Sequence, residues 1–592
     1  MVHLGIGIAF AILFGICLMG RASSVATAIL SMFAGAVWAV LSYCFLPTLA
    51  WGFGGILMML FVNSLAGTIV GSIVGERISS IGVLKTLIIA VIALGVPFFS
   101  SSPMFNSGEY RELLGPVKDS TFDKDVAPVD IGEVRTVDQD LAKRLGEKRL
   151  GEDAGLGSRV ELGTMNIQVI NGTFTVRDQN GQLTHVSFHN ELVWAGPLNH
   201  KSFWKQNSND STPGFILVSA TDQSKVYMVT TDSEGNPLKL HYLLSGGYFS
   251  KYLPRHLYNN GYMSVGLDDF SFEIGDDGRP YWVVTKYAKR VGFSGDDATG
   301  VVVVDAQTGA IKDYSIADAP SWIDRIQPES FITEQLNDWG VYVHGYWNTW
   351  FAGQDILKTT PGMSLVYGSD GRSYWYTGIT SAGSDQGTVG FVLVDTRTKQ
   401  VFWYKVAGAN EAAAAASAAN APGVKEAGYA PTNPILYNVA GQPTYFTTLK
   451  GNDGLPKMFA FISVTDYTVV GTGSSPAQAL RNYQIELGRK KGVSADGLVD
   501  RKVIEATVAD ITSEVVDGNT FYYLRLQGFA GKEFFATSQG QLVELKWTKV
   551  GDSVRLIFDE GESRSVNILA FDNPALDLVK LNNEAALRSN AE

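Results

Sequence analysis

The sequence predicts an α-helical membrane bundle followed by a large β-rich region of α+β class and a small C-terminal barrel. Between residues 4 and 99 only four side chains are charged, and the rest is apolar in blocks of about 20 residues, the length that spans a hydrocarbon core. After Ser100 the chain turns polar, and apolar residues recur with the period of two that is typical of strands. These observations predict a bilayer anchor that carries a water-exposed region.

Four transmembrane helices are predicted, separated by turn-forming or charged residues. They lie at residues 4–20, 25–46, 53–75 and 82–99. Four spans place both ends of the bundle on one side of the membrane. Arg21 lies in the first loop and Arg77 in the third, whereas the second loop has no charge. Because basic loops stay in the cytoplasm, we expect an integral protein of the plasma (inner) membrane whose C-terminal region is extracytoplasmic.

Three glycines form a ridge on the third predicted span. Gly67, Gly71 and Gly75 recur every four residues, a spacing that lets helix backbones approach closely. Two interpretations are open, namely packing inside this bundle and self-association between copies of the chain. Asn63 and Thr68 on the same span are candidates for hydrogen bonds between helices.

Residues 1–100 are therefore predicted to be the anchor, and residues 101–158 a linker with an amphipathic helix. Residues 106–133 mix charges with Pro and Gly and show no periodicity, which indicates a loosely packed arm. Apolar residues then recur at helical spacing from Val134 to Leu145. We expect this helix to dock on the polar region, because its mixed charges do not favour the membrane surface.

Residues 159–260 are predicted to form a β-rich N-terminal subdomain. Residues 165–170 and 173–176 have strand-like character on either side of Asn171-Gly172, a pair that suits a type I′ turn. We therefore expect a hairpin that turns at Asn171-Gly172.

A repeated unit fills residues 261–475, with the first copy in 261–350 and the second and third in 351–475. Each copy has a turn glycine, an aromatic strand, a loop and an apolar strand with a polar closing residue. The glycine and closing residue are 27, 24 and 24 positions apart: Gly278 to Asp305, Gly371 to Asp395 and Gly441 to Thr465. Helical stretches at residues 329–338 and 411–419 separate the copies. A helix followed by a small antiparallel sheet, repeated, is an α+β design.

The first copy carries Gly-x-Pro-Tyr-Trp-Val-Val from Gly278, and its later strand ends in Asp305-Ala306-Gln307-Thr308-Gly309. These stretches resemble the PepSY domain, an extracytoplasmic bacterial module of one helix and a short sheet, and the likeness covers residues 260–475. The chain also resembles large bacterial multispan membrane proteins that contain such repeats. The resemblance implies a non-catalytic role in the envelope, such as peptidase inhibition or binding, and carries over no functional residues. The second copy has Lys399 in place of the turn glycine.

Residues 476–592 are predicted to hold a helix and an OB-like barrel. Ala479, Tyr483 and Leu487 recur every four residues and indicate a helix over residues 476–491. Five strand candidates follow, at residues 503–516, 520–527, 533–537, 553–558 and 565–571. Such a barrel is either purely structural or a surface on which the rings of an oligosaccharide or oligonucleotide stack.

The composition disfavours several classes of function. The formal net charge of −12, with no dense basic run, makes nucleic acid an unfavoured partner. Cys17 and Cys44 both lie in predicted spans, so the polar region has neither a disulfide framework nor a thiolate zinc site. His185 and His189 share a strand face without a third ligand. We therefore predict no catalytic, cofactor-binding or metal-binding residues.

One dense group of aromatic residues is the candidate ligand site. Its members, spread over 29 positions, are Trp322, Trp339, Tyr342, Tyr346, Trp347 and Trp350. Such a group is either core or an interface edge, or a wall on which a peptide or glycan stacks.

The leading hypothesis is a membrane-anchored, non-enzymatic envelope protein whose extracytoplasmic region is a binding or scaffolding platform. Its expected partners are the lipid bilayer, a protein partner or a second copy, and a peptide or glycan ligand. The first alternative is a regulator of, or an enzyme acting on, envelope peptides or cell-wall material. The second reverses the topology and makes the barrel a cytoplasmic nucleic-acid binder.

Overall fold

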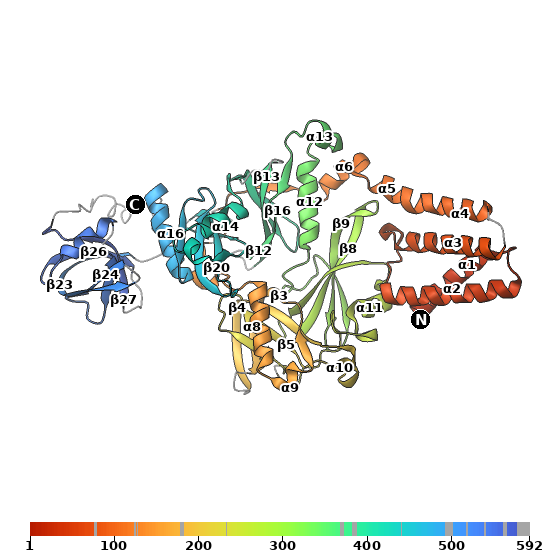
Figure 1. Cartoon of the computed structure of the whole chain (residues 1–592), viewed down its shortest axis with the longest axis horizontal. Helices are drawn as coiled ribbons and strands as arrows, with labels where there is room; N and C mark the ends of the chain where they lie inside the picture. The colour runs from red at the N-terminus through yellow and green to blue at the C-terminus, as the bar shows by residue number, and fades with distance from the viewer. Residues whose placement is uncertain are drawn as a thin grey trace. The chain divides into compact units, whose positions relative to one another are not determined.

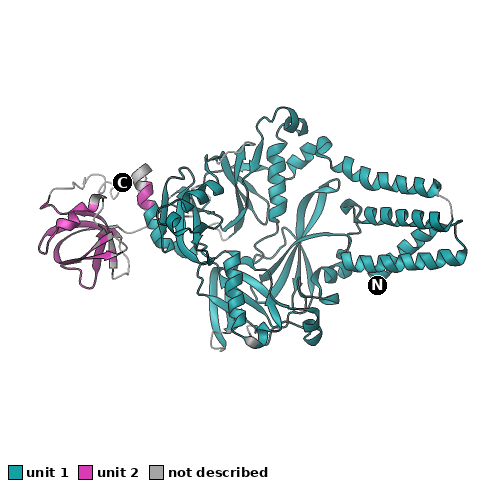
Figure 2. Ribbon diagram, viewed as in Figure 1, with its two compact units in different colours: residues 1–483 teal, residues 484–592 magenta. Residues whose placement is uncertain are grey.

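The computed structural model describes residues 1–75, 80–122, 126, 128–177, 183–232, 234–367, 372–381, 387–439, 441–491, 501–516, 519–537, 540–559 and 565–576. It divides into two compact units, residues 1–483 and 484–592 (Figure 2). The first unit holds the apolar helices and the three repeat copies, and the second holds the barrel.

Three helical segments of the described chain are long and apolar enough to cross a membrane (Figure 1). They are α2 (Ser24–Phe45), α3 (Gly55–Val74) and the run Ser80–Ser101, which comprises α4 (Ser80–Ala90), η2 (Val91–Gly95) and α5 (Val96–Ser101). The wider π-helical turn η2 precedes Pro97, which has no N–H to donate to the preceding turn. A shorter apolar helix, α1 (Val2–Leu18), has 17 residues. The predicted third loop, with Glu76 and Arg77, lies outside the described residues.

Small and polar side chains hold these helices together. A Cβ atom on Gly7 of α1 would lie 2.6 Å from the Gly35 carbonyl oxygen of α2, so the two backbones meet there. On the predicted ridge, Gly67 faces Cys17 of α1 and Gly71 faces Leu18, which places this ridge against a helix of the same chain. The two predicted polar residues also link helices: Trp38 Nε1 donates to Asn63 Oδ1 at 2.8 Å, and the Thr68 and Thr86 hydroxyls lie 2.8 Å apart.

The β-rich region meets the bundle at the α2–α3 loop and at the end of α5. The Tyr258 hydroxyl donates to the Pro47 carbonyl at 2.9 Å, and the rings of Phe53 and Tyr287 are 5.4 Å apart. The Phe293 N–H donates to the Ser101 hydroxyl at 2.7 Å. These contacts put the loop and the end of α5 on the same side of the bundle.

The three repeat copies each form a four-stranded antiparallel meander. The first has β7 (Gly266–Ile274), β8 (Pro280–Val291), β9 (Ser294–Asp305) and β10 (Ile311–Ser315). The second has β12 (Ser364–Tyr367), β13 (Ser373–Ser381), β15 (Gly390–Asp395) and β16 (Val401–Tyr404). The third has β19 (Ile435–Val439), β20 (Gln442–Lys450), β21 (Pro456–Ser463) and β22 (Val470–Gly473). The strand order expected from the sequence repeat is therefore present in all three.

The two helices predicted between the copies are present as α12 (Glu329–Val341) and α14 (Glu411–Ala419). The helix predicted after the third copy is present as α16 (Pro476–Lys491). Shorter elements complete the repeat region: α13 (Tyr346–Phe351), α15 (Val424–Ala427), β11 (Leu357–Thr359), β14 (Gly387–Thr388), β17 (Gly408–Ala409) and β18 (Ala430–Pro431). Side chains of the second and third copies share one core, which contains the buried Tyr376 and Tyr445 with their hydroxyls 2.7 Å apart.

The prediction of a loosely packed arm over residues 106–133 is wrong. The segment contains α6 (Pro103–Glu112), η3 (Ile131–Glu133) and β1 (Val117–Asp119), and β1 pairs in parallel with β16 of the second copy. Leu114 is 1% exposed and Phe122 is 6% exposed. The segment is packed because its apolar residues fill cores whose other members come from distant positions.

The helix expected from residue 134 begins five residues later. It is α8 (Gln139–Gly151), because the Asp138 side chain accepts from the Leu141 N–H and caps it there. Val134 and Val137 precede the helix as buried, non-helical residues. Docking on the β-rich region, as expected, is shown by Leu141, which lies in the same core as Ile216 of the N-terminal subdomain.

The prediction of a hairpin that turns at Asn171-Gly172 in the N-terminal subdomain is wrong. One strand, β3 (Asn166–Arg177), runs through these residues and pairs with β4 (Leu183–His200), and the register shifts there as a bulge. The pairing of β4 on both sides of the bulge overrides the local turn preference. The other elements are α9 (Ala154–Gly157), β2 (Val160–Leu162), α10 (Phe203–Ser208), β5 (Phe215–Ser219), β6 (Val226–Val229), η4 (Phe249–Lys251), α11 (Leu253–Leu257) and η5 (Tyr258–Tyr262).

In the second unit the five expected strands form a closed barrel. The ring order is β23 (Arg501–Val516), β24 (Asn519–Leu526), β25 (Glu533–Thr537), β27 (Ser565–Asp572) and β26 (Ser553–Asp559). A helical segment, η6 (Gly540–Trp547), connects β25 with β26. The fully buried Phe534 and Phe558 stack edge-on in its core, with ring centroids 5.0 Å apart.

Candidate functional site

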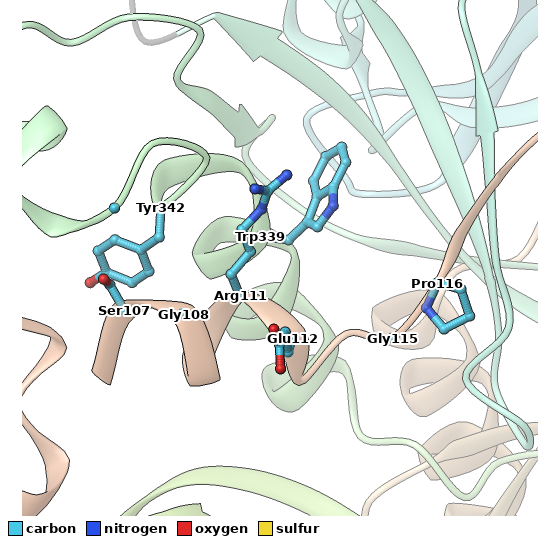
Figure 3. Close-up of a pocket in the computed structure, with 9 residues that line it drawn as sticks. Ser107, Gly108, Arg111, Glu112, Gly115, Pro116, Trp339 and Tyr342 are labelled. Atoms are coloured by element: carbon cyan, nitrogen blue, oxygen red, sulfur yellow. The ribbon is translucent and has the colours of Figure 1, made fainter. Parts of the chain in front are cut away.

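A cavity of about 540 Å³ lies between α6 and α12, at the place where the last apolar run enters the β-rich region (Figure 3). It is open to solvent, because Gly108, Glu112 and Pro116 on its rim are exposed. Its lining residues are Ser107, Gly108, Arg111, Glu112, Gly115, Pro116, Trp339, Tyr342 and Gly345.

Helix α6 supplies the polar side of the cavity. It starts where the Ser102 hydroxyl accepts from the Met104 N–H, and Pro103 occupies the first helical position. Tyr110 turns inward and donates its hydroxyl to the Ser101 carbonyl at 2.6 Å. Arg111, one position on, points toward α12 and donates to the Val343 carbonyl at 3.1 Å.

Helix α12 supplies the aromatic side. It buries Ile332 and Leu336 in the core, and this fixes the direction of Trp339 and Tyr342 on the following turn. Trp339 packs on Trp403 with ring centroids 6.1 Å apart, and Tyr342 lies 6.3 Å from Tyr110. Both rings are only partly buried, so each keeps a surface toward the cavity.

One carboxyl group and one phenol at the cavity have raised pKa values. Burial, with a smaller contribution from Glu334, raises the pKa of Asp338 to about 7. Burial, with Asp338 as the next cause, raises the pKa of Tyr342 to about 12. The arrangement offers a guanidinium, an indole face and a phenol, which together suit a ligand with a ring or apolar face and a carboxylate or similar acceptor. The nine lining residues include no His and no Cys.

The six predicted wall residues do not form one wall. Trp339 and Tyr342 line the cavity. Tyr346, Trp347 and Trp350 lie on α13, where Trp347 is 53% and Trp350 is 71% exposed. Trp322 packs elsewhere, on Tyr281 of the first copy at 5.3 Å.

Sequence reasoning missed the contribution of α6 to the cavity. Ser107, Arg111 and Glu112 fall in the stretch interpreted as a linker. A local signal was present, since Ser102-Pro103 is a typical helix start. Nothing local shows that Arg111 meets the chain near Val343.

A second group of ionisable side chains is buried where the first two copies meet. Burial raises the pKa of Glu273 to about 8 and that of Asp324 to about 6. Arg325 lies between the copies, donates to Asp269 Oδ2 at 3.0 Å and sits 5.8 Å from the Trp375 ring. The Asp324 carboxylate accepts from the Val169 N–H at 2.8 Å. Neither Glu273 nor Asp324 lines the α6–α12 cavity. The bond from Val169 makes Asp324 part of a structural junction, whereas Glu273 Oε2 is buried without a hydrogen-bond partner.

The barrel presents a separate pair of aromatic rings. Tyr523 on β24 and Phe535 on β25 are register partners, and their rings stack 6.1 Å apart. Both are partly exposed, whereas the adjacent Leu524 and Phe534 point into the core. Across the described residues of both units, no group of three His, Cys, Asp or Glu side chains is placed to hold a metal ion.

Comparisons with known proteins do not assign the chain to a family. No protein-family model and no curated protein matches the chain. Among solved structures, the Bacillus megaterium YpeB C-terminal domain aligns with 47% of this chain and 99% of its own length, at 8% sequence identity and a TM-score of 0.11. At that TM-score the likeness carries no argument about fold or function.

Proposed function

We propose that the chain is a membrane-anchored, non-enzymatic envelope protein whose extracytoplasmic region binds or scaffolds other envelope components. The observation that carries this proposal is the α6–α12 cavity, which joins Arg111, Trp339 and Tyr342 next to the last apolar run. The PepSY-like interpretation of the three meanders is consistent with binding rather than catalysis.

The proposed anchor has four spans, with α1 as the first. His3 near the start of α1 stacks on Tyr258 of the β-rich region with ring centroids 5.4 Å apart. At the other end, Leu18 faces Gly71, near the end of α3. Helix α3 starts at the loop that contacts the β-rich region. Helix α1 therefore runs alongside α3 and crosses the same thickness of the proposed membrane. Seventeen residues rise about 26 Å, close to the hydrocarbon thickness of about 30 Å.

The orientation is tested by fusing alkaline phosphatase or a fluorescent protein to the C-terminus of the full chain. We expect phosphatase activity and no fluorescence, because the fluorescent protein does not mature after export. Cytoplasmic fluorescence without phosphatase activity would reverse the topology and remove the envelope proposal.

The proposed ligand is a peptide or glycan that stacks on Trp339 and bonds to Arg111. Full-length protein in nanodiscs is titrated by calorimetry with soluble cell-wall disaccharide–peptides and with unmodified short peptides. We expect Trp339→Ala to weaken binding by up to about 10-fold, because stacking on an indole contributes about 0.5–1.5 kcal/mol. Arg111→Gln is expected to reduce binding of carboxylate-bearing ligands specifically.

The control is Trp547→Ala, which removes a more exposed indole from the barrel unit, 57% exposed where Trp339 is partly buried. Binding that is lost in Trp547→Ala and kept in Trp339→Ala would move the site to the barrel. Hydrolysis of either ligand by the purified chain, abolished by a single alanine substitution, would replace the binding proposal with the enzymatic one.

A second binding surface is proposed on the barrel. Its ring order, with the helical segment between β25 and β26, is consistent with the OB-like fold, in which the second and third strands carry ligands. Tyr523 and Phe535 lie on those strands with Arg525 exposed beside them. Because the chain is acidic, an oligosaccharide suits this surface better than a nucleic acid. This surface is tested by measuring retention of the variants on an immobilised oligosaccharide. We expect Tyr523→Ala to lose retention and Trp339→Ala to keep it.

A further inference from the structure

Exposed aromatic side chains of the first unit gather at two places beside the membrane helices. Among its described residues after Ser101, the strongly exposed Trp and Phe side chains are Phe105, Trp204, Phe249, Trp347, Trp350 and Phe351. Large exposed aromatics are costly on a water-facing surface, and scattered ones carry no meaning, but these are not scattered. They form what we name the α13 patch (Trp347, Trp350 and Phe351) and the α10 patch (Phe203, Trp204 and Phe249), with Phe105 between the α13 patch and the last span.

The α13 patch follows directly from the last apolar run. That run ends at Ser101, and α6 begins at Pro103. Ser107 of α6 accepts a hydrogen bond from the Tyr346 N–H at 3.2 Å, which fixes the start of α13. Ser107 is six positions after Ser101, which limits the distance from the end of the span to the start of α13 to about 20 Å. Exposed rings of Phe99 and Phe105, 6.0 Å apart, bridge the distance.

The fold turns the α13 aromatic rings outward. Asn348, 9% exposed, faces inward and ties the following loop through bonds with Gln354, donating to its carbonyl at 2.8 Å and accepting from its N–H at 3.1 Å. On the opposite side Trp347 and Phe351 stack 5.9 Å apart, and Phe351 is 82% exposed. A polar anchor inside and aromatic rings outside give α13 the character of an interfacial helix.

The α10 patch is tied to the end of another span. The Arg255 guanidinium donates to the Tyr43 carbonyl near the end of α2 at 3.1 Å, and to the Phe249 carbonyl at 2.9 Å. One side chain thus connects the membrane helix with the patch. Phe203 contacts both Trp204 and Phe249, at 5.2 and 5.6 Å between ring centroids. Phe249 has a φ of +50°, an unfavourable conformation for a bulky residue, and its ring is 60% exposed.

From these observations we propose that the α13 and α10 patches insert into the headgroup region of the bilayer, on the leaflet that faces the β-rich region. Trp favours that depth because its ring system is apolar and its N–H is polar, and Phe adds apolar surface on the membrane-facing side. The patches adjoin different span ends, at α5 and at α2, as Figure 1 shows for α13 beside α6 and α11 beside α2. Lys201 and Lys205 flank Trp204 and suit lipid phosphates. Two such contacts fix the tilt of the β-rich region and hold the α6–α12 cavity at the membrane surface.

Fluorescent probes on the full chain test the proposal. Trp350→Cys, Trp204→Cys and the barrel position Trp547→Cys are made singly in a Cys17→Ala/Cys44→Ala background and labelled with an environment-sensitive dye. Phe99→Cys, at the end of the last apolar run, reports insertion. Each protein is reconstituted into phosphatidylcholine–phosphatidylglycerol vesicles with or without a lipid that carries a quencher near its headgroup.

We expect the dyes at positions 350 and 204 to be blue-shifted and to lose fluorescence to the lipid quencher, as the dye at position 99 does. The dye at 547 is expected to keep its fluorescence. Dyes at 350 and 204 that are unquenched while the dye at 99 is quenched overturn the proposal and leave the anchor intact. A blue shift without lipid quenching shows a second copy of the chain on the patches and also overturns it. An unquenched dye at 99 overturns both the anchor and the proposal.

Discussion

The first and second repeat copies share two internal contacts and use one turn differently. In both, the indole N–H of the aromatic strand donates to a backbone carbonyl outside the meander: Trp282 to Tyr242 at 2.9 Å, and Trp375 to Gln327 at 2.8 Å. In both, the arginine after the turn glycine pairs with the aspartate that closes the later strand, at 2.7 Å for Arg279–Asp305 and 2.8 Å for Arg372–Asp395. The turn after that strand has Gly309 in one copy and Lys399 in the other.

Both turn residues have a left-handed backbone, with φ of +74° at Gly309 and +62° at Lys399. Gly309 lets the Tyr242 ring lie where a Cβ atom would be, and its carbonyl accepts from His256 Nε2 at 2.8 Å. Lys399 instead donates to Asp297 at 2.5 Å and to the Leu113 carbonyl at 2.7 Å. The difference teaches that the copies keep their interior and use this turn to attach to different neighbours.

The largest expected effect concerns the shared interior. Asp395 is 1% exposed and accepts from the Arg397 and Thr398 N–H groups as well as from Arg372. Asp395→Ala removes the acceptor of these hydrogen bonds and should lower the free energy of unfolding by about 4 kcal/mol. Urea unfolding of the detergent-solubilised full chain, followed by tryptophan fluorescence, measures it.

The control is Thr465→Ala at the corresponding position of the third copy, expected to cost about 1 kcal/mol. Equal losses in the two variants would show that the closing aspartate is not a special feature of the first two copies.

The next prediction concerns the pH dependence of stability. The first and second copies differ at one position on the strand that pairs with the aromatic strand. Glu273 pairs in register with Tyr281, and the equivalent partner of Tyr374 is Val366. Because burial raises the pKa of Glu273 to about 8, the folded chain keeps a proton that the unfolded chain has released above pH 4.5. Stability therefore falls as pH rises from about 4.5 to about 8.

Glu273→Gln should remove that fall, giving up to about 4 kcal/mol more stability at pH 8 and little change at pH 4.5. Asp324, whose pKa is raised to about 6, should leave a smaller decline between about pH 4 and 6. The measurement is the denaturation midpoint across this pH range. Parallel pH profiles for the variant and the natural chain would contradict it.

The smallest effect tests the turn itself. Lys399→Ala loses the bonds to Asp297 and Leu113 and keeps an unfavourable backbone, whereas Lys399→Gly loses the same bonds and relieves the backbone. The glycine variant should be more stable than the alanine variant by about 1 kcal/mol. If their melting temperatures agree, the left-handed turn is not what distinguishes Lys399 from Gly309.

Local patterns in the sequence predicted the elements whose signals are local. The bounds of α14 and α16 and the five barrel strands follow from helical spacing, alanine content and turn residues. The hairpin at Asn171-Gly172 failed because β4 pairs across it, and that pairing is not encoded in the two residues. The sequence also could not separate Trp322 from Trp339, since neighbours along the chain pack on different sheets.

The prediction of a linker over residues 106–133 also failed because the partners of these residues are distant in the sequence. Arg111 reaches Val343, 232 positions away, and Asp119 pairs with Lys405, 286 positions away. No window of sequence contains both partners. The polar half of the cavity therefore became visible only in three dimensions.

The edge strand β1 also constrains the order in which parts of the chain can fold. It leaves the ribosome directly behind the last apolar run, yet its parallel partner β16 is synthesised nearly three hundred residues later. Until then Leu114 and Val137 have no complete core to enter. Such distant pairing closes late and slowly. A nascent chain stopped after the first meander would expose these apolar side chains next to the bilayer, so quality control has a defined intermediate to recognise.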